Sequence, residues 1–249
     1  MSGRRNLMIA ISRGYDPDES AWLVVTTTEN KAYQFYLLDS NTTRLHTVDW
    51  GDGTKEAVST GTTAFKAFQH IYIMPGEYEI RVRGKYYGID LTGFSSTNAI
   101  VNEWFHVSNG VTVMNNWCGY GKIRAIGTKF SLPPNLVNMN SFARYGSLPA
   151  DAASKLQFPD SVNNLSVAFE NLGGSDFDVT HIFDKWVTKS RSRSVRQAFA
   201  LYNRNVIVGT APDLWNQGFT FSDTRSAFGN CTRLTNYNEI PASWGGGGA

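Results

Sequence analysis

Short apolar runs broken by turn residues fill the first ninety positions of the chain. In residues 77–83, Tyr78, Ile80 and Val82 alternate with charged side chains, directly after the turn-forming pair Pro75-Gly76. Alternation with a period of two is typical of a β-strand that has one face against a core and the other in water. The pattern therefore predicts a half-buried strand that begins at a tight turn.

A second turn signal follows the apolar run that finishes with Trp50. Gly51 and Gly53 permit a positive φ, and Asp52 between them can accept a hydrogen bond from its own backbone. This pattern predicts a hairpin corner. Asp49 and Asp52 supply too few oxygen atoms for the about six to eight ligands that Ca²⁺ takes, so turn roles suffice for both.

These two stretches together resemble the polycystic-kidney-disease (PKD) family of immunoglobulin-like β-sandwiches. The resemblance depends on W-G-D-G-T at 50–54 and on H-x-Y-x-x-P-G-x-Y-x-I-x-V at 70–82, and it covers roughly residues 20–92. It implies a spacer or adhesion module of a cell or virion surface, and not a catalytic pocket. The turn and core residues that it implies are Trp50, Gly51, Asp52, Gly53, His70, Tyr72, Pro75, Gly76 and Tyr78.

From about residue 93 the alternation gives way to an internal repeat. Aromatic residues recur in a shared context, and the steps between successive members are 25, 27, 30 and 29 residues. In a second register, Trp186, Trp215 and Trp244 follow one another at 29 residues, with Phe158 28 residues before the first. Prolines lie between the copies, where a residue without an amide proton can end a strand. The predicted repeat spine consists of Trp117, Phe142, Phe169, Phe199, Phe228, Trp186, Trp215 and Trp244.

A period of this length predicts a solenoid, because a coil of about 20 to 29 residues cannot cover its own apolar side and stacks on its neighbours instead. The clearest copy, Ser226–Leu234, is similar to the repeats of BspA-type leucine-rich-repeat surface proteins, over about residues 110–244. The copies lack the regular leucine ladder of that family, and residues 187–194 lengthen one copy. A leucine-rich-repeat-like solenoid and a β-solenoid with short helical turns are therefore both open.

Composition favours a mainly β chain without a charged partner. Aromatic residues make up 13% of the 249 positions, and 23 glycines indicate many tight turns. The net charge of +2 provides no strong field for nucleic acid, and no segment approaches the about 18 consecutive apolar residues of a membrane span. The apolar run Leu7–Ile11 is shorter than the about 7 to 15 residues of a secretory signal, so we expect a first strand or an arm that packs onto a neighbour.

Neither the cysteines nor the histidines form a metal or redox motif. Cys118 and Cys231 lie in the first and fifth copies, so coils stacked at about 4.8 Å would hold them about 19 Å apart, beyond the about 7 Å limit of a disulfide. We expect both to be small core residues, and His70 to make a hydrogen bond across the sandwich. No metal or cofactor is expected, because metal-ligand spacing is missing among His46, His70, His106 and His181.

Acidic residues offer the enzymatic alternative. Adjacent coils could present Asp160, Asp184 and Asp213 as the carboxylate pair, about 5 to 9.5 Å apart, that cleaves glycosides. Asp184 and Asp213 also fit turns before the repeat tryptophans, and nothing in the sequence indicates a raised carboxyl pKa. We therefore expect no enzymatic activity, and a polysaccharide depolymerase is the weakest alternative.

Two further features concern the surface. The run Lys189–Arg196 alternates serine with arginine, and we expect a solvated loop, with phosphate or an acidic partner as the alternative. The front of the chain has more aromatic residues than one sandwich core needs, so we expect some to face a partner or a sugar. They are Trp22, Tyr33, Tyr36, Tyr86, Tyr87, Trp104 and Phe105.

The sequence thus predicts four parts: an N-terminal arm or first strand (1–19), a PKD/Ig-like β-sandwich (20–92), a repeat solenoid (93–244) and a Gly-rich tail (245–249) that is flexible or approaches another chain closely. The two resemblances imply a non-enzymatic virion surface protein of a tailed phage, made in the host cytoplasm. It would be a capsid decoration, head-fibre or tail structural protein, present in multiple copies with other virion proteins as partners. The alternative is a tail-fibre-type adhesin that binds a host-surface glycan.

Overall fold

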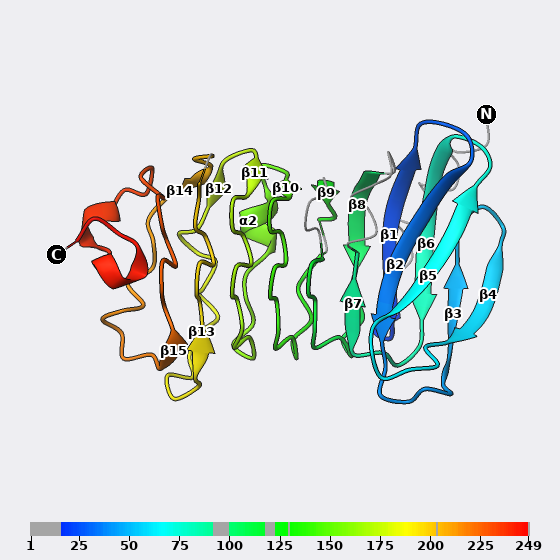
Figure 1. Cartoon of the computed structure of the whole chain (residues 1–249), viewed down its shortest axis with the longest axis horizontal. Helices are drawn as coiled ribbons and strands as arrows, with labels where there is room; N and C mark the ends of the chain where they lie inside the picture. Colours follow the sequence, from blue (N-terminus) through cyan, green and yellow to red (C-terminus); the bar gives the residue numbers. More distant parts are fainter. Residues whose placement is uncertain (1–15, 92–99, 118–122, 129, 203, 249) are drawn as a thin grey trace.

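The computed structural model describes residues 16–91, 100–117, 123–128, 130–202 and 204–248. Strands dominate this part of the chain, and its helical elements are the short α2 (Ala152–Lys155), η2 (Tyr237–Glu239) and η3 (Ala242–Trp244). The prediction of a mainly β protein is therefore confirmed. Figure 1 shows an elongated molecule, with the long strands at one end and the C-terminus at the other.

Two sheets make up the front end of the molecule. One has the strand order β4-β3-β6-β1-β8-β9, and the other has the order β5-β2-β7. Their strands are β1 (Glu19–Thr26), β2 (Lys31–Leu38), β3 (Leu45–Asp49), β4 (Lys55–Ser59), β5 (Lys66–Tyr72), β6 (Gly76–Arg83), β7 (Gly88–Asp90), β8 (Ile100–His106) and β9 (Ile123–Ile126).

Aromatic side chains join the two front sheets. Trp22 of β1 packs edge-on against Phe35 of β2, with ring centroids 5.2 Å apart. The indole Nε1 of Trp22 donates a hydrogen bond to the Tyr33 hydroxyl at 2.8 Å, which satisfies two buried polar groups together. The sheets therefore pack face to face over an aromatic core.

Strand β8 extends the front beyond the boundary that the sequence predicted between residues 92 and 93. It pairs antiparallel with β1, so that Trp104 lies opposite Trp22, and it pairs parallel with β9 on its other side. The front sheet therefore includes residues that were assigned to the repeat region, and no break in the sheet separates the two parts.

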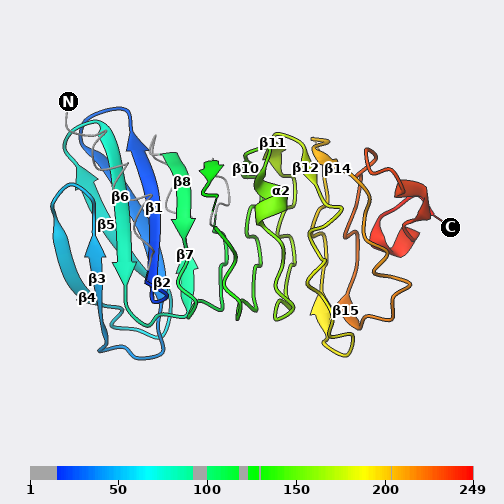
Figure 2. The same cartoon turned by 180° about the vertical axis from the view of Figure 1, so that it is seen from behind.

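Behind the front, the chain makes successive turns that lie side by side (Figure 2). We call each turn a coil. Parallel bridges connect Gly88 to Val113, Val113 to Asn138, Asn138 to Asn164 and Asn164 to Ser194. Because Gly88 belongs to β7, the coils continue directly from the second front sheet. Further parallel pairs between coils are formed by β10 (Ser147–Leu148) with β11 (Gly173–Gly174), β12 (Phe177–Asp178) with β14 (Ile207–Val208), and β13 (Arg193–Ser194) with β15 (Phe221–Asp223).

Alternate backbone amides hold each coil to the next. The amides of Met139, Ser141 and Ala143 donate to carbonyl oxygens of the following coil at 2.8, 3.1 and 2.6 Å. One non-glycine residue per coil adopts a left-handed conformation just before the spine aromatic, for example Ser141 with φ of 56° and Val167 with φ of 51°. Such a conformation is rare for a β-branched residue such as Val167.

The glycine-rich end packs against its own chain. Gly245 has a φ of +88° and lies against Gly229 of the preceding coil, and a Cβ atom on Gly246 would lie 2.2 Å from the carbonyl oxygen of Ile240. The amide of Gly248 donates to that same oxygen at 3.0 Å. The sequence predicted a tail that is flexible or closely approaches another chain. In the structure, residues 245–248 closely approach residues of their own chain and cover the last coil.

Candidate functional site

The corner at Gly51–Gly53 is held by its own side chains. Gly51 and Gly53 have φ values of 83° and 98°. Asp52 accepts a hydrogen bond from the Thr54 amide at 2.9 Å, and its other carboxylate oxygen lies 2.7 Å from His70 Nε2. Burial alone would raise the pKa of Asp52, but the hydrogen bonds from Thr54 and His70 outweigh it and lower the pKa. Because His70 belongs to β5, its hydrogen bond with Asp52 holds this corner against that strand.

A stack of rings continues from this corner. His70 lies flat on Trp50 with centroids 5.0 Å apart, and the stacked rings of Tyr72 and Tyr78 are 4.1 Å apart. The Tyr72 hydroxyl donates to the Trp50 carbonyl oxygen at 2.9 Å, and burial raises its pKa far above the usual range. Pro75 precedes Gly76, whose amide donates to the Thr26 hydroxyl at 3.1 Å. The residues singled out by the PKD resemblance thus form one structural corner.

The first register of the predicted spine is a column of rings, in which Phe142 is tilted against Phe169 and the other steps are stacked. Successive centroids are 4.6 Å apart from Trp117 to Phe142, 5.6 Å from Phe142 to Phe169, and 5.3 Å for both remaining steps, to Phe199 and Phe228. All five side chains are buried. The column spans every coil, so its side chains are part of the core and do not form a binding surface.

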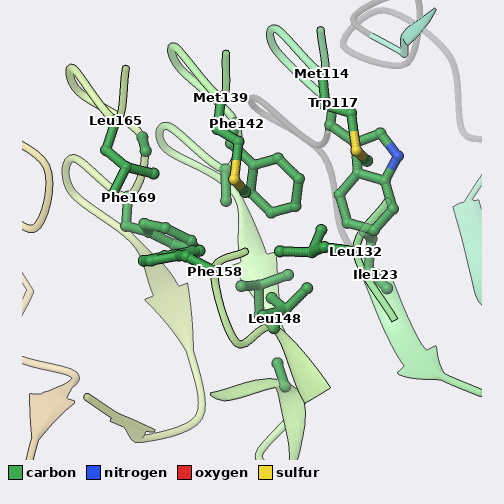
Figure 3. Close-up of a cluster of buried hydrophobic side chains, with 14 of the residues drawn as sticks. Met114, Trp117, Ile123, Leu132, Met139, Phe142, Leu148, Phe158, Leu165 and Phe169 are labelled. Atoms are coloured by element: carbon green, nitrogen blue, oxygen red, sulfur yellow. The ribbon is translucent and has the colours of Figure 1, made fainter. Parts of the chain in front are cut away.

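A second, aliphatic column runs beside the rings, and the sequence analysis missed it. Figure 3 shows Met114, Met139 and Leu165 next to the aromatic residues of their own coils. Each lies three or four residues before its aromatic, as does the buried Val195. That fixed spacing was a sequence signal that could have located the column.

The tryptophans of the second register lie in other ring contacts. Trp186 packs edge-on against Phe183 at 4.6 Å, and Trp244 packs edge-on against Phe221 at 4.8 Å and against Trp215 at 5.8 Å. Trp186 and Trp244 are buried, and Trp215 is half-buried. These rings fill the space between the coils and the loops that leave them.

Several front aromatics that we expected to face a partner are core residues instead. Trp22, Tyr33, Tyr86 and Trp104 are buried, because the core continues past the front sheets into the coils. The remaining three, Tyr36, Tyr87 and Phe105, are half-buried.

The three candidate carboxylates have separate partners. Asp160 accepts hydrogen bonds from the amides of Val187 and Thr188 and lies 2.9 Å from Arg193 Nη2, whereas Asp184 pairs with His181 and Asp213 accepts from Asn216. Burial opposes ionisation of Asp160, but its hydrogen bonds and Arg193 lower its pKa to about 2. An acid of that pKa is ionised at neutral pH and is a poor proton donor.

The basic run departs from the expected solvated loop at Arg193, which is completely buried, whereas Lys189, Ser190, Ser192 and Arg196 are exposed. Its guanidinium lies between Trp186 and Phe219, 4.4 and 5.3 Å from their ring centroids, and donates to the Thr188 carbonyl oxygen at 2.7 Å. The ion pair with Asp160 and the two aromatic faces compensate the buried charge. Arg193 therefore anchors the insertion at 187–194.

Cys231 is buried, and its thiol donates to the Phe199 carbonyl oxygen at 3.0 Å. Cys118 lies outside the described residues. Across the described ranges, no three His, Cys, Asp or Glu side chains come together as a metal site would require. In the same ranges, no helix has both the length and the apolar character needed to cross a membrane.

A polar cleft of about 320 Å³ opens where β2 ends and the loops around residues 40, 85 and 108 meet. Its lining includes Asp39, which is buried, and Arg44, whose Nη1 lies 3.1 Å from Asp39 Oδ1. Behind Asp39 lies the buried His46, with Nε2 3.2 Å from Asp39 Oδ2 but out of line for a hydrogen bond. Burial lowers the pKa of His46, and the Asp39 carboxylate only partly offsets this. The cleft can hold a small polar group, and the sequence analysis missed it because its residues come from separate loops.

Comparisons with protein-family models, with curated proteins and with solved structures give no match.

Proposed function

We propose that the protein is a non-enzymatic surface protein of a tailed-phage particle, with a PKD/Ig-like sandwich in front and a repeat solenoid behind. The continuous aromatic core supports this proposal. A rod that is packed along its whole length suits a spacer that must keep its shape while it carries contacts at its ends. In this role the protein acts through protein–protein contacts, either on the capsid or in the tail.

An exposed apolar corner supports docking through the front. Ile71, Ile73 and Met74 are all more than half exposed, and Ile73 is 70% exposed. They belong to or directly follow β5. Among the described residues, β5 is the edge strand of its sheet and pairs only with β2. Exposed apolar side chains at an open strand edge are a feature that proteins usually cover, and they suit a partner that adds a strand. We propose that another virion protein covers this corner while the coils project.

Immunogold electron microscopy of phage particles from the source culture tests the location. Label over the head would establish a decoration or head-fibre role, and label at the tail would establish a tail component. Label on cells alone would contradict the virion proposal.

Incorporation of variants tests the docking surface. Ile73→Lys adds a charge to the apolar corner, and we expect it to reduce the copy number in purified particles without a change in melting temperature. Leu45→Lys is the matched control, because Leu45 is 64% exposed but lies on β3, away from the β5 edge. Equal incorporation of both variants would show that the corner is not the docking surface.

A second function, a tail-fibre-type adhesin for a host-surface glycan, is favoured by one observation on the coils. Tyr202 is 53% exposed and lies in a cluster of hydrogen-bonding side chains. The depolymerase alternative receives no such support, because the strongly ionised Asp160 is bound to Arg193 and is not placed as an acid.

A further inference from the structure

Four polar or aromatic residues from neighbouring coils gather near the buried carboxylate of Glu170. Arg144 comes from the second coil, Glu170 from the third, and Gln197, Tyr202 and Arg204 from the fourth and the loop that follows it. Nothing in the repeat pattern places charged groups here, since the corresponding positions in the other coils have different side chains. We call these residues the Glu170 cluster.

The carboxylate of Glu170 is the centre of the cluster. Arg144 Nε donates a hydrogen bond to Glu170 Oε2. The Arg144 guanidinium also lies 5.1 Å from the centroid of the Tyr145 ring. The backbone of Glu170 is fixed as well, because the Glu170 carbonyl oxygen accepts from the Tyr145 amide at 2.9 Å. The position of this buried acid is thus set by side chain and backbone together.

Tyr202 places an aromatic ring at the surface of the cluster. Its hydroxyl accepts a hydrogen bond from Gln197 Nε2 at 2.7 Å, and its amide donates to Asn171 Oδ1 at 3.4 Å. Burial, followed by the nearby Glu170 carboxylate, raises the pKa of Tyr202. The ring is thus oriented by polar contacts at its tip and at its backbone while much of it faces solvent.

Arg204, two residues after Tyr202, adds a second and exposed guanidinium. A Cβ atom on Gly173 would lie 1.7 Å from Arg204 Nη1, so the guanidinium lies directly over the backbone of Gly173. The amide of Gly173 donates to Gly146 of the neighbouring coil at 2.8 Å, which brings Arg204 close to the Tyr145 segment. The cluster therefore contains two guanidinium groups and one carboxylate, with a net charge of +1.

This combination of groups matches an acidic sugar. An exposed aromatic ring offers an apolar face for a pyranose, an amide side chain hydrogen-bonds hydroxyls, and a guanidinium group binds a carboxylate in a planar, bidentate manner. We infer that the Glu170 cluster binds a carboxylate-bearing pyranose of the hexuronate class, as it occurs in acidic polysaccharides of cell surfaces. This inference deepens the second proposed function and rests on it.

Binding of defined oligosaccharides to the purified full-length protein tests the inference. We expect a galacturonate hexamer or a hyaluronan oligosaccharide to bind, and neutral maltohexaose to bind at least about tenfold more weakly. Arg204→Gln and Tyr202→Ala should each weaken hexuronate binding about tenfold, the effect of losing one charge-assisted hydrogen bond or one stacked ring. Arg225→Gln is the control, because it removes another exposed guanidinium, which pairs with Asp223 on the next coil.

Failure of both acidic probes to bind, equal binding of maltohexaose, or equal weakening by Arg225→Gln would each overturn the inference. Melting temperatures of the variants separate loss of a contact from loss of the fold. Because the assay uses the isolated protein, its result is independent of the location of gold label on particles. A label on cells alone, with hexuronate binding intact, would contradict the virion proposal and leave the sugar site standing.

Discussion

The indole rings of Trp104 and Trp117 lie with their centroids 4.4 Å apart, and this contact joins the front sheets to the first coil. On its other side, Trp104 stacks on Trp22 of the front sheet at 5.1 Å. The column of rings therefore runs from the centre of the front into the repeat region without interruption. A molecule with one continuous core is expected to unfold as one cooperative unit.

The first prediction concerns this junction. Trp104→Ala removes a completely buried ring, and we expect it to lower the free energy of unfolding by about 3–5 kcal/mol, because a large cavity opens between front and coils. Urea unfolding followed by far-UV circular dichroism and by tryptophan fluorescence measures this effect. Val187→Ala at an exposed position is the control, with less than about 0.5 kcal/mol expected. Two separate transitions in the unchanged protein would show that the parts fold independently.

The core was predictable to the extent that it repeats. Spine aromatics such as Phe169 and Phe199 stack because one large ring per coil must lie over the ring of its neighbour, and this requirement preserves the period in the sequence. Strand β8 lies within the range that the sequence predicted as repeat region, and its pairing with β1 was not predictable because it joins residues about eighty positions apart.

The polar sites were not predictable, because their partners are distant in the sequence and no repeat relates them. Arg193 belongs to an alternating Ser-Arg segment that is typical of a solvated loop, yet it is buried against Asp160 and Phe219, which precede and follow it by 33 and 26 residues. In the same way, Glu170 accepts a hydrogen bond from Arg144, which precedes it by 26 residues. Only the stacking of coils brings these charges together.

The ion pair between Arg193 and Asp160 provides the second prediction. Asp160→Asn leaves a buried guanidinium without its counter-charge, and we expect a loss of about 2–3 kcal/mol, below the about 3–5 kcal/mol of a fully buried pair because Asp160 is partly exposed. Asp184→Asn, in an exposed pair with His181, should cost less than about 1 kcal/mol. Chemical unfolding at pH 7 measures both losses. Equal, small losses would mean that Arg193 is held by its aromatic neighbours alone.

The third prediction concerns the loss of the stabilisation by Asp160 at acidic pH. Its pKa of about 2 in the folded protein lies below the usual value of 3.8, so the folded state binds fewer protons than the unfolded state between these values. The stabilisation is fully present above about pH 4 and is lost as the pH falls through about 2. Unfolding at pH 7 and at pH 2.5 should therefore differ less in Asp160→Asn than in the unchanged protein. An identical difference in both proteins would contradict the shift.

The fourth prediction concerns His46, which faces Asp39, Arg44 and the Tyr86 ring. Burial lowers its pKa from 6.5, so the unfolded state binds more protons at mildly acidic pH, and stability falls as the pH decreases below about 6.5. We expect His46→Gln to flatten the decline of melting temperature between pH 8 and pH 5. The half-buried His106, whose pKa partial burial also lowers, maintains part of the slope. A slope unaffected by His46→Gln would contradict the prediction.

The last prediction concerns the glycines that cover the final coil. Gly246→Ala would place a Cβ atom 2.2 Å from the Ile240 carbonyl oxygen, and this backbone cannot move without losing the hydrogen bond that the oxygen accepts from Gly248. We expect a loss of about 1–3 kcal/mol, the usual effect of an overpacked site, together with faster proteolysis at the C-terminal end. Gly110→Ala is the matched control, because its Cβ would meet its nearest neighbour at an ordinary 3.5 Å. Equal stability and equal protease resistance of the two variants would show that residues 245–248 do not hold the last coil closed.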